Sequence, residues 1–127
     1  MTLVELLVAV AITFIIFLGL SNAGLVVLDQ NIKNSQRDEA VSVADNVMQQ
    51  IRNIPIDNLA LGTFPDNVFR QIRGINQRYS VTTTVASIDP LNAAVGRQVT
   101  VNVAWDRYEY GLPRTYNHQI MTIVRQR

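Results

Sequence analysis

The sequence predicts an α+β fold in which a long N-terminal helix, apolar in its first half, packs on a three- to four-stranded antiparallel sheet. Three observations lead to this prediction. An uncharged run extends from Leu6 to Leu28, an amphipathic pattern with helical spacing follows it, and β-rich runs occupy the second half of the chain. The chain has 127 residues, no cysteine and a formal net charge of +1. This length predicts one globular unit, and this charge provides no general attraction for nucleic acid.

The uncharged run is long enough to cross a membrane. Its 23 residues would span roughly 35 Å as a helix, slightly more than a hydrocarbon core of about 30 Å. We therefore expect residues 1–28 to form a transmembrane helix, or a helix whose apolar surface is covered by other protein. A secretory signal peptide, cleaved near Ser21, would need a positively charged start, which residues 1–5 lack. A simple single-pass anchor leaves Glu5 unexplained, because a carboxylate among apolar side chains is costly without a partner.

Residues 29–54 are expected to continue this helix into the head as an amphipathic segment. The apolar positions that recur near helical spacing are Leu28, Ile32, Ala40, Ala44, Val47, Ile51 and Ile54. The helix should stop near Ile54, because Pro55 disfavours helical geometry in the preceding residue and cannot donate a backbone hydrogen bond. We expect the stripe from Ala40 through Ile54 to cover the strand that holds Val99 to Trp105.

Residues 55–127 are expected to form the head. Residues 55–77 show no sustained period, so we expect a long connecting loop with one short helix near Asn67 to Ile72. The β-rich runs predict strands at about Tyr79 to Ile88, Arg97 to Trp105 and Tyr116 to Val124. Turn residues separate these runs and predict an antiparallel meander. They are Asp89, Pro90 and Asn92 in the first turn and Gly111 and Pro113 in the second.

The N-terminal segment MTLVELLVAVAI resembles the mature N-terminus of type IV pilins and type II secretion pseudopilins. The resemblance covers about the first 28 residues and joins Thr2, two aliphatic residues, Glu5 and an unbroken apolar run. It implies a subunit of a homo-oligomeric helical filament, processed by a prepilin peptidase, N-methylated at Met1 and assembled by dedicated machinery. It also implies that Glu5 pairs with the N-terminal amine of a neighbouring copy. The implied location is the inner membrane before assembly, then an extracellular pilus or a periplasmic pseudopilus.

Two positions depart from the family pattern. Met1 stands where phenylalanine is usual, so it is either the first residue left after processing or an initiator methionine. We expect processing, because without a basic leader the segment lacks the positive charge that would hold its N-terminus in the cytoplasm. Asn22 stands where many major pilins have a helix-bending proline. We expect the helix to have a different weak point there. In an assembled filament it should be loosened around residues 18–25, because several residues of this stretch have a low helix propensity. These residues are Gly19, Ser21, Asn22 and Gly24. The small residues Ala9, Ala11, Gly19 and Ala23 are expected to pack between helices.

No catalytic constellation, cofactor motif or metal site is expected, and we predict no enzyme activity. His118 is the single histidine, and the acids Asp57, Asp66, Asp89 and Asp106 are too dispersed for a calcium loop.

Two groups of side chains have both a functional and a structural interpretation. The arginines Arg70, Arg73 and Arg78, near Phe69 and Tyr79, could contact DNA or could form ion pairs with neighbouring subunits. The tyrosines Tyr108, Tyr110 and Tyr116 could pack around a turn or form contacts between subunits.

Three functions remain open at this point. The first is a structural subunit of a type IV pilus or related filament, stored in the membrane and assembled by helix bundling. The second, in the same class, is a minor pilin or pseudopilin that primes or caps a filament. The third, in another class, is a membrane-tethered binding domain for which the helix is only an anchor.

Overall fold

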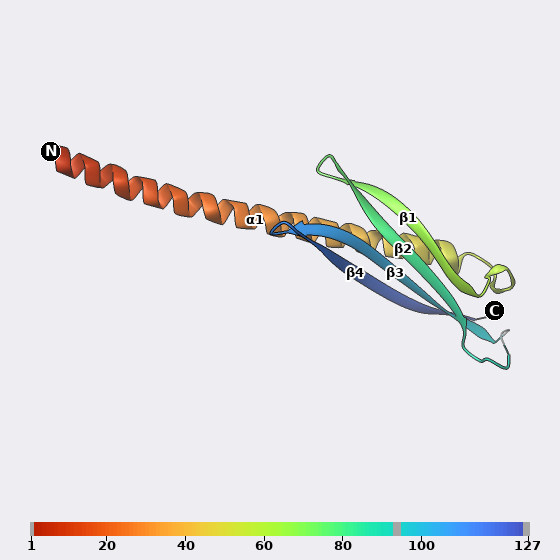
Figure 1. The fold of residues 1–127 in the computed structure, drawn as a ribbon. Helices are drawn as coiled ribbons and strands as arrows, with labels where there is room; N and C mark the ends of the chain where they lie inside the picture. The colour runs from red at the N-terminus through yellow and green to blue at the C-terminus, as the bar shows by residue number, and fades with distance from the viewer. Residues whose placement is uncertain (1, 93–94, 126–127) are drawn as a thin grey trace. The chain divides into compact units, whose positions relative to one another are not determined.

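The computed structural model describes residues 2–92 and 95–125 and has the α+β fold that the sequence predicts. Helix α1 spans Leu3–Arg52 and is followed by the short 3-10 helix η1, Ile56–Asn58. Four strands follow (Figure 1): β1 Gly62–Ile72, β2 Ile75–Ser87, β3 Gly96–Glu109 and β4 Leu112–Arg125. The chain divides into two compact units, one ending at Ser35 and one beginning at Gln36, so α1 contributes to both.

The second part of α1 supplies the helical half of the head's core. The helix ends close to Ile54, as Pro55 predicts. The buried residues of α1 are Gln36, Ala40, Val43, Ala44, Met48 and Ile51. The expected stripe is therefore correct at Ala40, Ala44 and Ile51 but wrong at Ile54, which lies past the helix and is 39% exposed. Val43 and Met48 fill the remaining core positions.

The sheet has the order β1-β2-β3-β4 with every neighbouring pair antiparallel, which confirms the expected meander. Strand β3 alternates as a half-buried strand should. Its buried apolar side chains are Val99, Val101, Val103 and Trp105, and they share one apolar cluster with the buried residues of α1 from Ala40 onward. The predicted packing of the helix on this strand is confirmed.

Strand β1 corrects the prediction for residues 55–77. Residues Gly62–Ile72 form neither a loop nor a helix but an edge strand, paired with β2 from Gly62↔Val85 to Ile72↔Ile75. Most of its side chains are exposed, so no apolar alternation marks it in the sequence. Pro65 lies inside it and is tolerated because an edge strand has one unpaired side.

Two tight turns close the hairpins. Arg73 and Gly74 join β1 to β2 with φ values of 50° and 82°, and Tyr110 and Gly111 join β3 to β4 with φ values of 52° and 77°. Two consecutive residues with positive φ are typical of type I′ turns, whose twist matches that of the strands. The turn at Gly111 was predicted, whereas the turn at Gly74 was hidden by the missed strand β1. The turn at Asp89 is confirmed by the hydrogen bond that the Asn92 amide donates to the Asp89 carbonyl, 3.2 Å long.

Tyr79 joins the sheet to α1 and makes the stability of the head sensitive to alkaline pH. Its side chain is fully buried, and its hydroxyl donates a 2.9 Å hydrogen bond to the Gln36 carbonyl. Burial, with a smaller contribution from Glu39, raises the pKa of Tyr79 from 10.0 to about 12. Since the folded pKa lies above the unfolded pKa, this stabilisation is complete below about pH 10 and is lost as the pH rises through about 12.

We predict that Tyr79→Phe lowers stability by about 1 kcal/mol near neutral pH, because one hydrogen bond is lost. The variant should lose less stability than the wild type between about pH 10 and about pH 12. Urea titrations at several pH values, scored by protease resistance of the head, would measure both effects. Tyr108→Phe is the control, because Tyr108 is exposed on β3. If Tyr79→Phe lost as much stability between about pH 10 and about pH 12 as the wild type, Tyr79 would not be the group responsible for the alkaline sensitivity.

Candidate assembly and membrane segment

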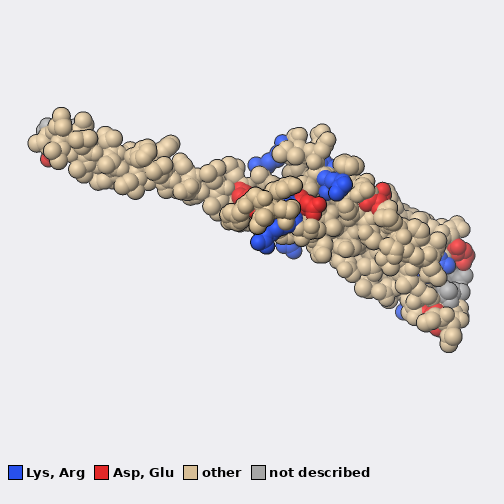
Figure 2. Space-filling model, viewed as in Figure 1, with Lys and Arg blue, Asp and Glu red and all other residues tan. Residues whose placement is uncertain are grey.

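The first part of α1 exposes an unbroken apolar surface. Every residue from Leu3 to Leu28 is exposed, and its large apolar side chains range from 49% exposed at Leu18 to 75% at Leu3. This part is tan along most of its length in Figure 2, the colour of residues that are not charged. By length and composition, α1 could cross a membrane. An apolar surface of this size requires lipid or another protein to cover it, which is consistent with membrane anchoring.

Glu5 lies at the start of this helix and caps it. The Thr2 amide donates a 2.7 Å hydrogen bond to Glu5 Oε2, and the Glu5 amide donates a 3.3 Å hydrogen bond to Thr2 Oγ1. These reciprocal bonds form a capping box, which satisfies two backbone donors that a helix start leaves open. This role was not predicted, although a threonine followed three residues later by a glutamate is its signature. Glu5 therefore has a structural task in the single chain.

The expected pairing of Glu5 with an N-terminal amine stays a prediction. Met1, to which methylation and this amine were assigned, lies outside the described residues. Glu5 is exposed, and a carboxylate accepts several hydrogen bonds. The capping bond therefore leaves Glu5 able to accept a further donor.

A shallow apolar groove of about 370 Å³ lies on the exposed surface of α1, lined by Ala9, Val10, Thr13, Phe14 and Phe17. The Thr13 hydroxyl donates a 2.8 Å hydrogen bond to the Ala9 carbonyl, so this polar group is satisfied within the helix. Small residues between large apolar ones let the backbone of a second helix approach closely. Of the small residues expected to pack between helices, the groove contains Ala9.

The expected weak point lies within the helix in the single chain. Helix α1 continues through Gly19, Ser21, Asn22 and Gly24. A Cβ atom added at either glycine would meet nothing within 4 Å, so neither glycine is required by packing inside this chain. The loosening around residues 18–25 concerns the assembled filament and stays a prediction.

We predict that the double variant Gly19→Ala/Gly24→Ala folds and inserts normally but forms fewer filaments. Each replacement should stabilise the helix by about 1 kcal/mol, and this opposes local melting. Filament yield and the hydrogen-bond ladder in a filament structure would measure the effect. Val26→Ala lies outside the stretch and should assemble as the wild type does. Wild-type yield from the double variant, or an unbroken ladder in wild-type filaments, would refute the weak point.

The three arginines considered for DNA contact lie on one hairpin but do not form one patch. Arg70 is on β1 and forms a 3.0 Å ion pair with Glu39 of α1, Arg73 is in the turn, and Arg78 is on β2 opposite Phe69. Val68 pairs with the buried Tyr79 in the same ladder, so the alternation of the strands places Arg70 and Arg78 on opposite faces of the sheet. DNA contact stays a prediction.

The three tyrosines of the second hairpin divide between the two interpretations. Tyr116 packs, because its ring stacks on Trp105 with centroids 6.0 Å apart and its hydroxyl donates a 2.6 Å hydrogen bond to Glu109. The hydrogen bond to Glu109 is the main cause that raises the pKa of Tyr116, followed by burial. Tyr108 and Tyr110 are 76% and 102% exposed and are available for contacts with another molecule.

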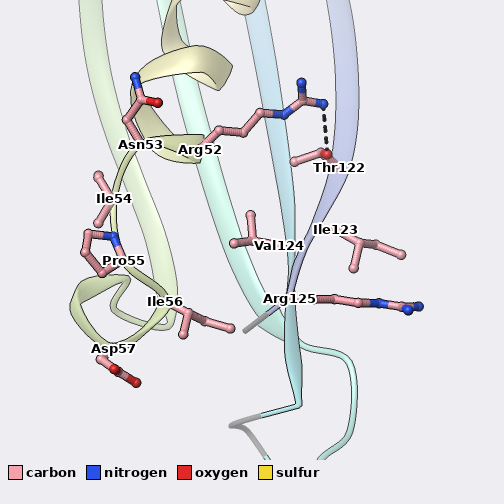
Figure 3. A pocket seen from close by; sticks show the side chains of 10 residues that line it. All are labelled: Arg52, Asn53, Ile54, Pro55, Ile56, Asp57, Thr122, Ile123, Val124 and Arg125. Atoms are coloured by element: carbon pink, nitrogen blue, oxygen red, sulfur yellow. Dashed lines mark hydrogen bonds between the residues drawn. The ribbon is translucent and has the colours of Figure 1, made fainter. Parts of the chain in front are cut away.

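A groove of about 800 Å³ lies between the residues that follow α1 and the end of β4 (Figure 3). Arg52 crosses its upper part and donates a 3.1 Å hydrogen bond to Thr122. Figure 3 shows the side chains of Asp57 and Arg125, which both line this groove, on opposite sides of it. Among residues 2–92 and 95–125, no cluster of His, Asp or Glu side chains could hold a metal ion.

No protein family, no curated protein and no solved structure matches the chain.

Proposed function

We propose that this protein is a structural subunit of a type IV pilus or a related filament. In this proposal residues 1–28 hold the subunit in the membrane and then enter the filament core, where they bundle with the same helix of other copies. The observation that supports it most is that the core of the head is complete without this segment. Among the described residues, the core cluster begins at Ala40, while every residue from Leu3 to Leu28 is exposed. The apolar half of α1 is thus available to lipid or to other subunits.

The mechanism exchanges lipid contacts for contacts between helices. Because lipid tails are as apolar as leucine, van der Waals packing rather than the hydrophobic effect must favour the bundle. The groove at Ala9 and Thr13 provides a place where a neighbouring helix can approach. Glu5 would add a directional element by pairing with the N-terminal amine of a copy shifted along the axis by about 6 Å, the rise of four residues.

The proposal can be tested in a bacterium that has pilus assembly machinery. Fibres sheared from the cell surface should contain the protein, and mass spectrometry of its N-terminal peptide should show Met1 with an added methyl group. A matched variant replaces residues 2–28 with an unrelated membrane-spanning helix. It should stay in the membrane with a folded head and be absent from the fibres.

The outcomes separate the candidate functions. Absence of the wild-type protein from fibres, with both it and the helix-swapped variant held in the membrane with a folded head, would favour a membrane-tethered binding domain and overturn the proposal. If the protein is present, its abundance distinguishes a major subunit from a minor pilin or pseudopilin that primes or caps the filament.

A further inference from the structure

The two hairpin turns lie at the end of the head where α1 enters it. In a meander, the β1–β2 and β3–β4 turns share one end of the sheet, opposite the β2–β3 connection, and Figure 1 shows them on the same side. Gln36, the first residue of the second unit, contacts this end. Its side chain donates a 3.1 Å hydrogen bond to Gln77, and its carbonyl accepts the bond from Tyr79. The turns are thus at the end of the head that contains Gln36, the residue with which the second unit begins.

The chain connectivity keeps these turns near any membrane that holds the apolar segment. Leu28 is the last residue of the uncharged run, and Gln36 is only eight positions later. Even a fully extended chain covers at most about 3.6 Å per residue, so the entry end of the head stays within about 30 Å of the membrane surface.

The turns expose apolar and aromatic side chains. Ile75 is 71% exposed, Leu112 is 63% exposed and Tyr110 is completely exposed. The positive φ values at Arg73 and Tyr110 keep both turns tight. Tyrosine is enriched where a protein meets the membrane interface, and aliphatic side chains gain from entering the boundary of the acyl chains.

The same end carries the positive charge that an anionic membrane attracts. From Arg70 to Arg78 there are three arginines and no acid, and Figure 2 shows several blue groups, with red groups beside them, at this end of the head. The acids of the second hairpin are engaged within the head. Asp106 accepts a 2.6 Å hydrogen bond from Thr115, and Glu109 lies 3.7 Å from Arg114. The opposite end also exposes an apolar side chain, Leu91, and there Arg97 and Arg125, on neighbouring strands, share the end of the sheet with the acid Asp89.

We propose that this turn surface, formed by Arg73, Ile75, Arg78, Tyr110 and Leu112, docks the head on the anionic surface of the membrane before assembly. The arginines would bind lipid phosphates and the apolar side chains would enter the headgroup boundary. This inference rests on the proposed membrane storage of the subunit. Nucleic acid also carries phosphates, but it has no apolar region that Ile75 and Leu112 could enter. The membrane has a second advantage, because the apolar helix would tether the head to it at high effective concentration.

The experiment uses the full chain in lipid vesicles and exploits its lack of native cysteine. Single cysteines replace Tyr110, Leu112, Leu91 or Phe14 and are labelled with a polarity-sensitive probe. Leu91→Cys is the matched control, because it is exposed at the opposite end of the sheet, and Phe14→Cys reports whether α1 is in the bilayer. In phosphatidylglycerol vesicles, the probes at positions 110 and 112 should be several-fold less accessible to an aqueous quencher than the probe at position 91.

Two changes should remove this protection. Neutral phosphatidylcholine vesicles remove the anionic headgroups, and the double variant Arg73→Gln/Arg78→Gln removes two charges from the turn surface. If the probe at position 14 is protected by lipid while the quencher reaches the probes at positions 110 and 112 freely, this inference is overturned and the proposed function stands. An accessible probe at position 14 would overturn both. Protection that depends on protein density instead of lipid charge would assign the surface to another copy, and protection only on addition of DNA would assign it to nucleic acid.

Discussion

Replacing Glu5 with glutamine is expected to leave the protein in the membrane with a folded head and to reduce its entry into filaments severely. Glutamine keeps the acceptor that the Thr2 amide uses, so the capping box should persist. The change removes the negative charge that would pair with the amine of an incoming subunit. Removing one partner of a buried ion pair costs about 3 kcal/mol or more, which corresponds to about a hundredfold in an equilibrium constant.

The measurement is the ratio of sheared-fibre protein to membrane protein for each variant. Thr2→Ala is the matched control, because it removes the hydroxyl of the capping box and leaves the charge of Glu5. It should weaken the start of the helix by about 1 kcal/mol and reduce assembly only slightly. Wild-type fibre yield from Glu5→Gln would refute the pairing. Equal loss in Thr2→Ala and Glu5→Gln would show that the helix cap matters rather than the charge.

Replacing Trp105 with alanine is expected to destabilise the head by about 3–5 kcal/mol, the usual cost of truncating a large buried aromatic side chain. Trp105 is 7% exposed and lies between two other rings, with its centroid 6.0 Å from that of Tyr79 and 6.0 Å from that of Tyr116. This loss is a large part of the about 5–15 kcal/mol that stabilises a typical domain.

Protease resistance of the head over a urea series in mild detergent would measure this loss. Tyr108→Ala removes an exposed aromatic side chain from the same strand and should change stability by less than about 0.5 kcal/mol. Similar urea midpoints for both variants would contradict the assigned core. In the wild type, the single tryptophan should also resist quenching by an aqueous quencher, since it is buried.

The parts of the fold that the sequence predicted are those in which burial imposes a period. Strand β3 lies inside the sheet with one face on α1, so Val99 to Trp105 alternate in sequence as they do in burial. Strand β1 could not be predicted in this way. It is an edge strand with mostly exposed side chains, so burial does not impose an alternation of apolar and polar residues on its sequence. The pairing with β2 that defines it is made by backbone hydrogen bonds, which impose no pattern on the side chains.

The candidate site was predictable in its apolar character but not in its geometry. The absence of charge from Leu6 to Leu28 identified the segment, because composition alone decides whether a helix can enter lipid. The spacing of Thr2 and Glu5 is the signature of a capping box, so this local role of Glu5 was predictable, whereas no contact within the chain reports on a partner in another copy. The turn surface could not be foreseen, because it is formed by two turns, at Arg73 and Tyr110, that only the meander places at the same end of the sheet.

The strand order has a consequence for how the head can fold. Each strand pairs only with its neighbour in sequence, so no strand must wait for a distant segment before it finds a partner. Such local topologies fold faster than those that depend on distant pairings. If the chain emerges from the membrane behind its apolar helix, β1 and β2 can pair first and β3 can then close the core against α1. The edge strand β4 is added last, so folding can follow the order of synthesis.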